Sequence, residues 1–131
     1  MRIIMTLEQK QLLIADLCGR VPYDTVVSTD GDNEVYLRSV DTFGYVEVAD
    51  YKNENVFDIE NVKPYLRPMS SMTDEEREEY DEWHLELESG RIKDWKNADY
   101  IDWLNAHHFD YRGLIEKGLA LEAHEGIYNL N

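Results

Sequence analysis

The sequence predicts an α+β fold in which an N-terminal helix is followed by a small antiparallel SH3-like β-barrel or meander and then by three C-terminal helices. Apolar side chains follow a helical spacing over residues 7–18, alternate with polar ones over residues 23–59, and return to helical spacing in the last third of the chain. With 131 residues and 43% apolar side chains, the chain has the size of one domain. We therefore expect a single domain over 1–131, with a helix plus meander over 5–70 and a helical part over 73–131.

The stretch MTLEQKQLLIADLCGR predicts the first helix. Thr6 is a suitable N-cap, Gln9 three residues later completes a capping box, and Gly19 is expected just beyond the helix as its C′ residue. Cys18, the single cysteine, is expected to be a buried and unreactive thiol, because no helix N-terminus or basic cluster adjoins it. The predicted apolar face consists of Leu7, Leu13, Ile14, Leu17 and Cys18.

Alternation after this helix predicts four short strands, in YDTVVS, NEVYLRSV, GYVEVADY and NVFDI, separated by segments rich in Asp, Asn and Gly. A single helical turn around Asn61 and Val62 would precede a fifth strand at Tyr65–Arg67, which is the element order of an SH3-like small barrel. Pro64 and Pro68 are expected to confine the fifth strand to an edge of the sheet, because proline donates no N–H. If the barrel is correct, the buried sheet positions are Val26, Val35, Leu37, Val46, Val48 and Phe57.

The C-terminal part predicts helices with recognisable N-caps. Thr73 is placed to cap DEEREEYDEWHLELES, and Glu76 three residues later completes a second capping box. Asn97 is expected to cap a third helix over residues 98–107, and Asp110 is expected to cap a short fourth helix.

The net charge of −15 is concentrated in one stretch: residues 71–90 carry nine acidic side chains and one basic one. Such a chain lacks the basic surface that binds a phosphate backbone, so no direct nucleic-acid binding is expected. No apolar run approaches the roughly 20 residues that cross a bilayer, and the N-terminus becomes polar too early for a secretory signal. We predict a cytoplasmic protein that does not bind membranes and whose partner is an unidentified protein, with a basic protein as the complementary choice.

The acidic stretch has two interpretations that the sequence leaves open. One is a solvated helix face, on which like charges four residues apart, such as Glu75 and Glu79, cost a little stability. The other is a partner surface, either for a basic protein or as a carboxylate array that imitates DNA phosphates. Tryptophan is enriched at binding hot spots, so two tryptophans join this surface. The candidate partner surface consists of Glu75, Glu78, Glu79, Glu82, Trp83 and Trp95.

A polar cluster follows the third predicted helix, where His107, His108 and Asp110 lie within four positions. Both histidines extend apolar helix faces, and Asp110 occupies an N-cap position, which favours a structural joint between helices. A zinc site would need three or four converging ligands, whereas these histidines are adjacent and no second cluster follows. A general base is a further alternative. We predict no catalytic, metal-binding or cofactor-binding residue, and no cofactor.

Three stretches, MTLEQKQLLIADLC, VKPYLRPMSSMT and DWLNAHHFDYRGLIEKGLALEA, are similar to a family of uncharacterised small acidic proteins encoded by prophages and mobile elements of anaerobic gut bacteria. The resemblance covers most of the chain from Met5. It implies an accessory protein of a mobile element that works inside a bacterial cell, and it implies no catalytic residue.

Phosphate-binding glycine loops, a nucleophile elbow and zinc-protease spacing are absent from the sequence, so we predict that the protein is not an enzyme. The expected function is that of a non-enzymatic accessory protein acting through protein–protein interaction. One alternative is a nucleic-acid-related role, by DNA mimicry of the acidic helix or by binding through the small barrel. A second alternative is a metal-dependent hydrolase that uses His107, His108 and Asp110.

Overall fold

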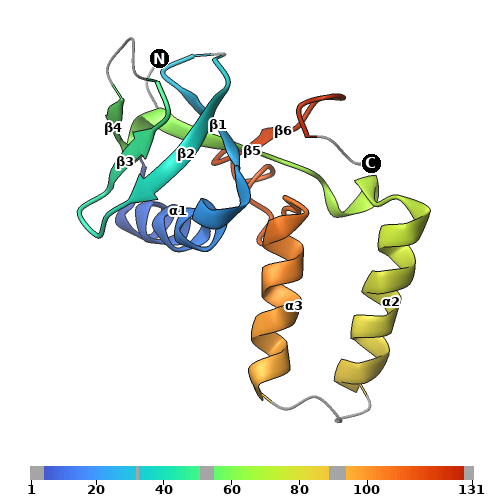
Figure 1. Cartoon of the computed structure of the whole chain (residues 1–131). Helices are drawn as coiled ribbons and strands as arrows, with labels where there is room; N and C mark the ends of the chain where they lie inside the picture. Colours follow the sequence, from blue (N-terminus) through green and yellow to red (C-terminus); the bar gives the residue numbers. More distant parts are fainter. Residues whose placement is uncertain (1–4, 32, 51–54, 89–93, 129–131) are drawn as a thin grey trace.

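The computed structural model has an α+β fold, as the sequence predicts, in which a six-stranded sheet packs on one helix and two further helices project from it (Figure 1). We call the sheet and its packed helix the sheet body, and the two projecting helices the helical hairpin. The structure describes residues 5–31, 33–50, 55–88 and 94–128, without the side chains of 86–88 and 94–97. Within this part of the chain, no helix combines the length and the apolar character needed to cross a bilayer.

Helix α1 (Leu7–Arg20) begins with the predicted capping box. The Thr6 hydroxyl accepts the Gln9 N–H at 3.1 Å, and the Gln9 side chain accepts the Thr6 N–H at 3.0 Å. The helix does not end before Gly19 as predicted; it runs on to Arg20 and continues into a 3-10 turn, η1 (Val21–Tyr23). A Cβ on Gly19 would lie 3.0 Å from the Asn105 Nδ2, so this glycine allows a close helix approach.

The predicted apolar face of α1 is only partly correct. Leu13 and Leu17 are fully buried, but the side chain of Leu7 is 70% exposed and Cys18 is exposed rather than buried. The buried surface of α1 also includes Asp16 and Arg20, which are both fully buried and lie against Phe109 and Arg112 after α3. A pattern based on apolar residues places charged side chains on the exposed side of the helix. Asp16 and Arg20 can instead be buried because they pair with each other.

The sheet contains the five predicted strands, a 3-10 turn before the fifth, and a sixth strand that the sequence did not predict. The order in space is β4-β3-β2-β1-β5-β6, so the sheet is open with β4 and β6 at its edges, and the predicted SH3-like barrel is not confirmed. The strands and turn are β1 (Val26–Thr29), β2 (Val35–Val40), β3 (Tyr45–Val48), β4 (Val56–Asp58), η2 (Ile59–Asn61), β5 (Val62–Leu66) and β6 (Leu121–Glu122).

Strand β5 is not an edge strand, contrary to the prediction from its prolines. It pairs antiparallel with β1, where Pro64 lies opposite Val27, and parallel with β6 through Tyr65 and Leu66. The β6 pairing thus begins just beyond Pro64, so the missing N–H does not interrupt it.

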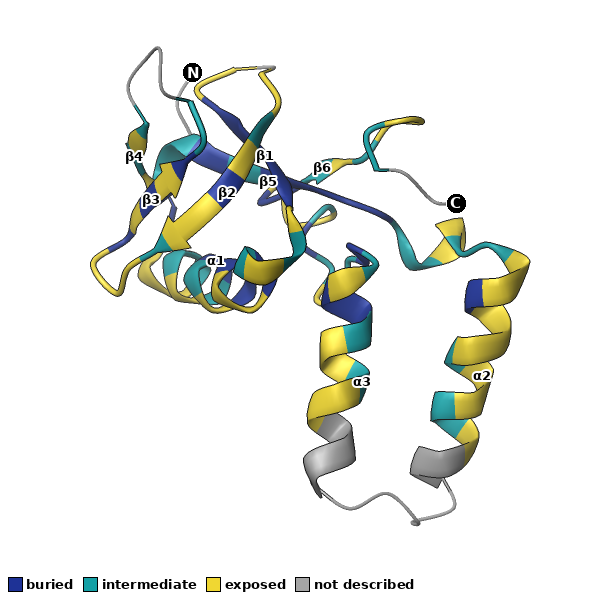
Figure 2. Cartoon of the chain, in the orientation of Figure 1, coloured by how far each residue is buried: buried dark blue, intermediate teal, exposed yellow. Residues whose placement is uncertain are grey.

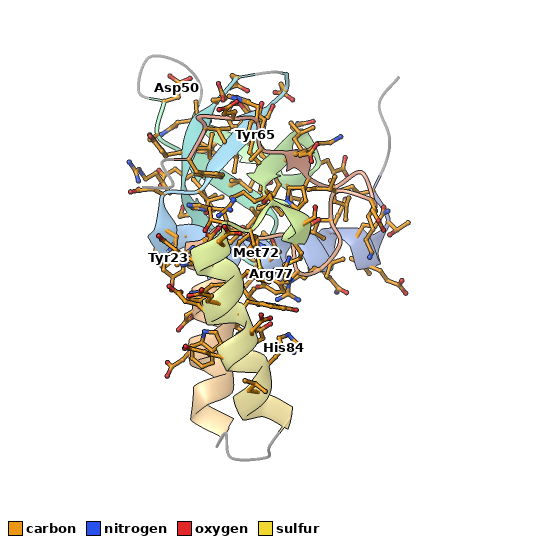
Figure 3. The ribbon with its side chains drawn as sticks, turned by 90° about the vertical axis from the view of Figure 1, so that its right-hand side faces the viewer. Tyr23, Asp50, Tyr65, Met72, Arg77 and His84 are labelled. Atoms are coloured by element: carbon orange, nitrogen blue, oxygen red, sulfur yellow. The ribbon has the colours of Figure 1, made fainter. Side chains whose placement is uncertain are left out.

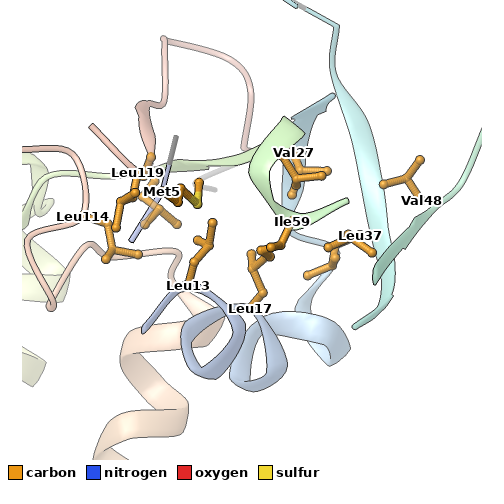
Figure 4. Packing of buried hydrophobic residues seen from close by; sticks show 13 residues of the cluster. Met5, Leu13, Leu17, Val27, Leu37, Val48, Ile59, Leu114 and Leu119 are labelled. Carbon is orange, nitrogen blue, oxygen red and sulfur yellow. The ribbon is translucent and has the colours of Figure 1, made fainter. Parts of the chain in front are cut away.

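The core lies between α1 and the sheet (Figure 4). Leu13 and Leu17 of α1 face Val27, Leu37 and Ile59 from the strands and η2, and the core also contains residues from the C-terminal turns. Four of the six predicted sheet positions, Val26, Leu37, Val46 and Val48, are buried, whereas Val35 and Phe57 are partly buried at its margin.

Among the described residues, two α-helices lie between β5 and β6, not the three predicted for the C-terminal part. After a 3-10 turn, η3 (Met69–Ser71), come α2 (Asp74–Glu88) and α3 (Asp94–Ala106). Because α3 begins at Asp94, Asn97 lies inside the helix and is not its cap. Residues 110–118 form turns rather than a fourth helix. Gly113 and Gly118 in this segment have φ angles of +72° and +74°, a left-handed conformation that helices do not use.

Candidate functional site

The helical hairpin displays the predicted acidic surface on helices that project beneath the sheet body (Figures 1 and 3). Among the described side chains of α2 and α3, eight acidic ones are exposed, and Arg77 is the only lysine or arginine. Figure 2 shows that α2 is exposed along most of its length. The exposed acidic residues are Asp74, Glu75, Glu78, Glu79, Asp81, Glu82, Asp99 and Asp102.

Aromatic side chains join the facing sides of α2 and α3. Tyr80 and Trp83 of α2 lie with their ring centroids 6.4 and 5.7 Å from the Tyr100 ring of α3. Burial between the helices raises the pKa of Tyr100 to about 12. The Trp103 Nε1 donates a 2.6 Å hydrogen bond to the Glu79 carboxylate, which ties one acidic residue of the candidate surface to α3.

The six residues of the predicted partner surface therefore have different surroundings. Glu75, Glu78, Glu79 and Glu82 are exposed, and of these Glu79 is engaged with Trp103. Trp83 is half-buried, with its ring 5.7 Å from that of Tyr100. The side chain of Trp95 lies outside the described residues.

A buried polar clamp, formed by Arg67, Glu76 and His107, attaches the hairpin to the sheet body. The Arg67 guanidinium donates two hydrogen bonds to the Glu76 carboxylate, at 2.7 and 2.8 Å. It also donates to the backbone carbonyl oxygens of His107 and Ser71, each at 3.1 Å. The His107 Nδ1 lies 2.6 Å from the Glu76 Oε2. One carboxylate thus connects the end of β5, the start of α2 and the end of α3.

Glu76 also completes the predicted capping box of α2. Its carboxylate accepts the Thr73 N–H at 2.9 Å, while its own N–H donates to the Thr73 hydroxyl at 3.2 Å. Burial alone would raise the pKa of Glu76, but the hydrogen bonds from Arg67, Thr73 and His107 outweigh it and lower the pKa to about 2. The clamp therefore holds a charged carboxylate at any pH above that value.

The three residues of the predicted polar cluster point to different partners. His107 contacts Glu76, whereas the ring of His108 stacks on Tyr128 with a centroid separation of 3.7 Å. The carboxylate of Asp110 accepts the N–H groups of Leu114 and Ile115 at 2.8 and 3.0 Å. These contacts favour the structural interpretation. Across the described residues, no three His, Cys, Asp or Glu side chains are grouped so that they could hold a metal ion.

His108 is buried and has a left-handed backbone, with φ at +64°. Burial disfavours its charged form, and the nearby arginines Arg20 and Arg67 add to this effect, so the pKa of His108 falls from 6.5 to about 4. The imidazole is therefore neutral near pH 7.

A second buried ion pair, between Asp16 and Arg20, lies where α1 meets the segment that follows α3, at Phe109. The Arg20 Nε donates to the Asp16 carboxylate at 2.8 Å, and the Arg20 Nη2 donates to the Phe109 carbonyl oxygen at 2.8 Å. Arg112 adds a second cation 3.2 Å from Asp16. Sequence analysis missed both this pair and the clamp. The spacing of Asp16 and Arg20, four residues apart on one helix, is the signal that could have indicated the first pair.

No protein-family model, curated protein or solved structure matches the chain.

Proposed function

We propose that the protein is a non-enzymatic accessory protein that binds another protein through the exposed acidic face of the helical hairpin. The observation that carries this proposal is the segregation of charge, with eight exposed acidic side chains and one arginine among the described hairpin side chains. The complementary partner is a basic surface, because such charge pairing steers association and selects partners.

The way in which the hairpin is held supports a binding role. In α2 the single buried residue among those described is Glu76, so this helix adds almost nothing to the apolar core. Yet four polar contacts of the Glu76 carboxylate, two with Arg67, one with the Thr73 N–H and one with His107, hold the start of α2, and aromatic contacts hold the side of α2 that faces α3. A surface held in one geometry loses less conformational entropy on binding than a loose one.

The biological setting is also a proposal. The resemblance of three stretches of the chain to small acidic proteins of prophages and mobile elements supports an accessory role inside a bacterial cell, in the cytoplasm. In that setting, the basic partner would belong to the host or to the machinery of the element.

The test is affinity capture from a lysate of the source organism with matched charge variants. One variant carries Glu75→Gln, Glu78→Gln and Glu82→Gln, which leaves Glu79 on Trp103. The control carries three exposed changes outside the hairpin, Glu8→Gln, Glu47→Gln and Glu116→Gln. We expect the wild type and the control to capture the same protein, and the hairpin variant to lose it.

Equal capture by both triple variants would reject the hairpin as the binding surface. Failure of the wild type to enrich any protein would reject the proposed function itself. Raising the salt concentration should weaken true binding, because exposed charges are screened within about 8 Å at physiological ionic strength.

DNA mimicry is a second candidate, favoured by the presence of exposed carboxylates on two helices rather than on one. In this case the captured protein would bind DNA, and duplex DNA would compete with the hairpin for it. A partner that holds DNA and the hairpin at the same time would exclude mimicry.

A further inference from the structure

A pocket of about 220 Å³ opens between the end of β5 and the C-terminal turn, close to the start of α2. One wall comes from Arg67, Pro68 and Ser71, and the other from residues 122–128. Figure 1 shows the same arrangement, with the turn after β6 lying beside the segment that leads into α2. Small-molecule sites usually have about 300 to 1,000 Å³, so this volume suits one side chain of a partner better than a whole ligand.

The pocket is not built for an anion, although Arg67 lines it. The two terminal nitrogens of its guanidinium donate to Glu76 and to the carbonyl oxygens of Ser71 and His107. The side chain is buried, and its charge is matched by the Glu76 carboxylate. The remaining wall is mainly apolar, and Pro68, Ala123, Ile127 and Tyr128 contribute to it.

The charge of the pocket comes from two exposed carboxylates, those of Glu122 and Glu125. Within the described part of the chain, neither carboxylate has an ion pair or a side-chain hydrogen bond. His124 lies between them, but its Nε2 is 2.6 Å from the Glu34 carboxylate and its Nδ1 is 3.0 Å from the Glu125 carbonyl oxygen. Both neighbours accept hydrogen bonds and so favour the charged ring, which raises the pKa of His124 above its ordinary value, and the Glu34 carboxylate balances the charge of the protonated ring. The pocket lining therefore combines a mainly apolar wall with two exposed carboxylates.

We propose that this pocket binds one long cationic side chain, arginine or lysine, from the protein partner. The aliphatic stem of such a side chain would cover Pro68, Ala123 and Ile127, and its charged end would lie between the carboxylates of Glu122 and Glu125. Long cationic side chains have this division, with an apolar stem and a charged end that stays near water.

This inference rests on the proposed function in one respect only, since the arginine or lysine is supplied by the proposed protein partner. Ser71 belongs to η3, and the first turn of α2, with Asp74 and Glu75, follows three residues later. A basic segment with one side chain in the pocket would therefore place its neighbouring residues near the acidic first turn of α2. The pocket would act as an anchor beside a broader electrostatic surface.

The test uses a small probe that needs no partner. N-acetyl-arginine amide is titrated into the whole protein while the backbone amide signals are followed by NMR. We expect saturable shifts at Ala123, Ile127 and Tyr128, and little change in α1. N-acetyl-citrulline amide has the same shape without the charge, and N-acetyl-norleucine amide keeps only the apolar stem. Both should bind at least about tenfold more weakly, which corresponds to about 1.4 kcal/mol.

Two matched double variants complete the test. Glu122→Gln with Glu125→Gln should abolish the preference for arginine over citrulline, whereas Glu8→Gln with Glu116→Gln changes the net charge equally and should preserve it. Equal binding of arginine and citrulline to the wild type, or no saturable shift at the pocket up to about 10 mM probe, would overturn the inference.

This experiment separates the inference from the proposed function. The hairpin variant with Glu75→Gln, Glu78→Gln and Glu82→Gln should still bind the arginine probe at the pocket, even though it loses the captured partner. If the arginine probe shifts the pocket signals but the protein captures no partner, the pocket inference is supported and the proposed function is rejected. If the protein captures a partner but the probe causes no such shifts, the proposed function is supported and the pocket inference is rejected.

Discussion

The sheet body and helix α2 of the hairpin are stabilised in different ways. In the body, leucine, isoleucine and valine side chains from α1 and the strands form one buried cluster. In α2 the buried residue is the charged Glu76, and the other described side chains are exposed or half-buried. The body thus depends on apolar burial, whereas α2 depends on a clamp of hydrogen bonds and on aromatic contacts. It follows that α2 should respond to mutation and pH differently from the sheet.

The two buried ion pairs also differ between the regions. Asp16 and Arg20 belong to one helix and lie inside the body, so their pairing survives any movement of α2. Arg67 and Glu76 belong to different elements, so their contact breaks if α2 leaves the body. Because a buried charge without its partner is strongly unfavourable, the second pair makes the attachment of α2 cooperative.

The largest expected effect is at the clamp. Arg67→Ala leaves the Glu76 carboxylate buried without its cation, and we expect the free energy of unfolding to fall by about 3 to 5 kcal/mol. Urea denaturation followed by circular dichroism measures this change. Arg77→Ala removes an exposed arginine from α2 and should stay within about 0.5 kcal/mol of the wild type. Similar losses in both variants would show that the clamp has no special role.

A matched pair of leucines compares apolar burial in the two regions. Leu17 is fully buried in the body, and Leu17→Ala should cost about 2 to 5 kcal/mol through lost contacts and a cavity. Leu85 on α2 is 67% exposed, and Leu85→Ala should cost less than about 0.5 kcal/mol. Thermal unfolding of both variants checks the difference, and a large effect at Leu85 would mean that α2 buries more apolar surface than described.

As the pH falls, the free energy of unfolding should decrease first through His108 and only at lower pH through Glu76 of the clamp. The pKa of His108 is about 4 in the folded protein and 6.5 as its ordinary value, so between these limits the unfolded chain takes up a proton that the folded protein does not. Stability is therefore complete above pH 6.5 and should fall by about 3 kcal/mol as the pH decreases to 4. The ordinary pKa of Glu76 is 4.5, and its contribution is lost as the pH falls from there towards 2.

The variant His108→Asn isolates the first of these two losses. Asparagine tolerates the left-handed backbone at this position, so the corner is preserved while the titrating ring is removed. Urea denaturation at several pH values should show no histidine-dependent loss between pH 6.5 and 4 in this variant. The loss should persist in His124→Asn, since His124 is exposed and its pKa is raised rather than lowered. If the free energy of unfolding of His108→Asn fell with decreasing pH as steeply as that of the wild type, His108 would not be the group responsible for the loss.

The smallest effects compare the two capping boxes. Thr6→Ala and Thr73→Ala each remove a hydroxyl that accepts a backbone N–H at a helix start, and each should cost about 1 kcal/mol of unfolding free energy. They should differ in local opening, as measured by hydrogen exchange. Thr73→Ala should lower the free energy for opening α2, whereas Thr6→Ala should leave it unchanged, because α1 stays folded when α2 opens. Identical effects on α2 would contradict the proposed division of the molecule.

Local chemistry explains which parts of the fold could be predicted. The capping boxes at Thr6 and Thr73 need only residues three positions apart, and both are present. Alternation located the first four strands, and the turn around Asn61 and Val62 indicated the fifth, but the sixth strand depends on the pairing of Tyr65 with Leu121, which no local pattern encodes. The burial of Leu7 and Cys18 was predicted wrongly because charged residues were assumed to face solvent.

The same distinction applies to the candidate site. The exposure of Glu75, Glu78 and Glu82 follows from the density of acidic residues in the sequence. The exception is Glu76, which is buried by partners nine and 31 residues away in the chain. Nothing in the local sequence distinguishes it from its acidic neighbours except its position in the capping box. Long-range pairing therefore determines which carboxylate holds the hairpin and which ones face solvent.

The most direct test of this account is native-state hydrogen exchange of the wild-type protein at increasing concentrations of denaturant. We predict two groups of amides, with those of α2 opening at a lower free energy than those of β1, β2 and α1. We also predict that Leu17→Ala lowers the value for the body and leaves the value for α2 unchanged, because the defect is present whether α2 is attached or open. A single free energy shared by α2 and the sheet, lowered equally by Leu17→Ala, would contradict the account.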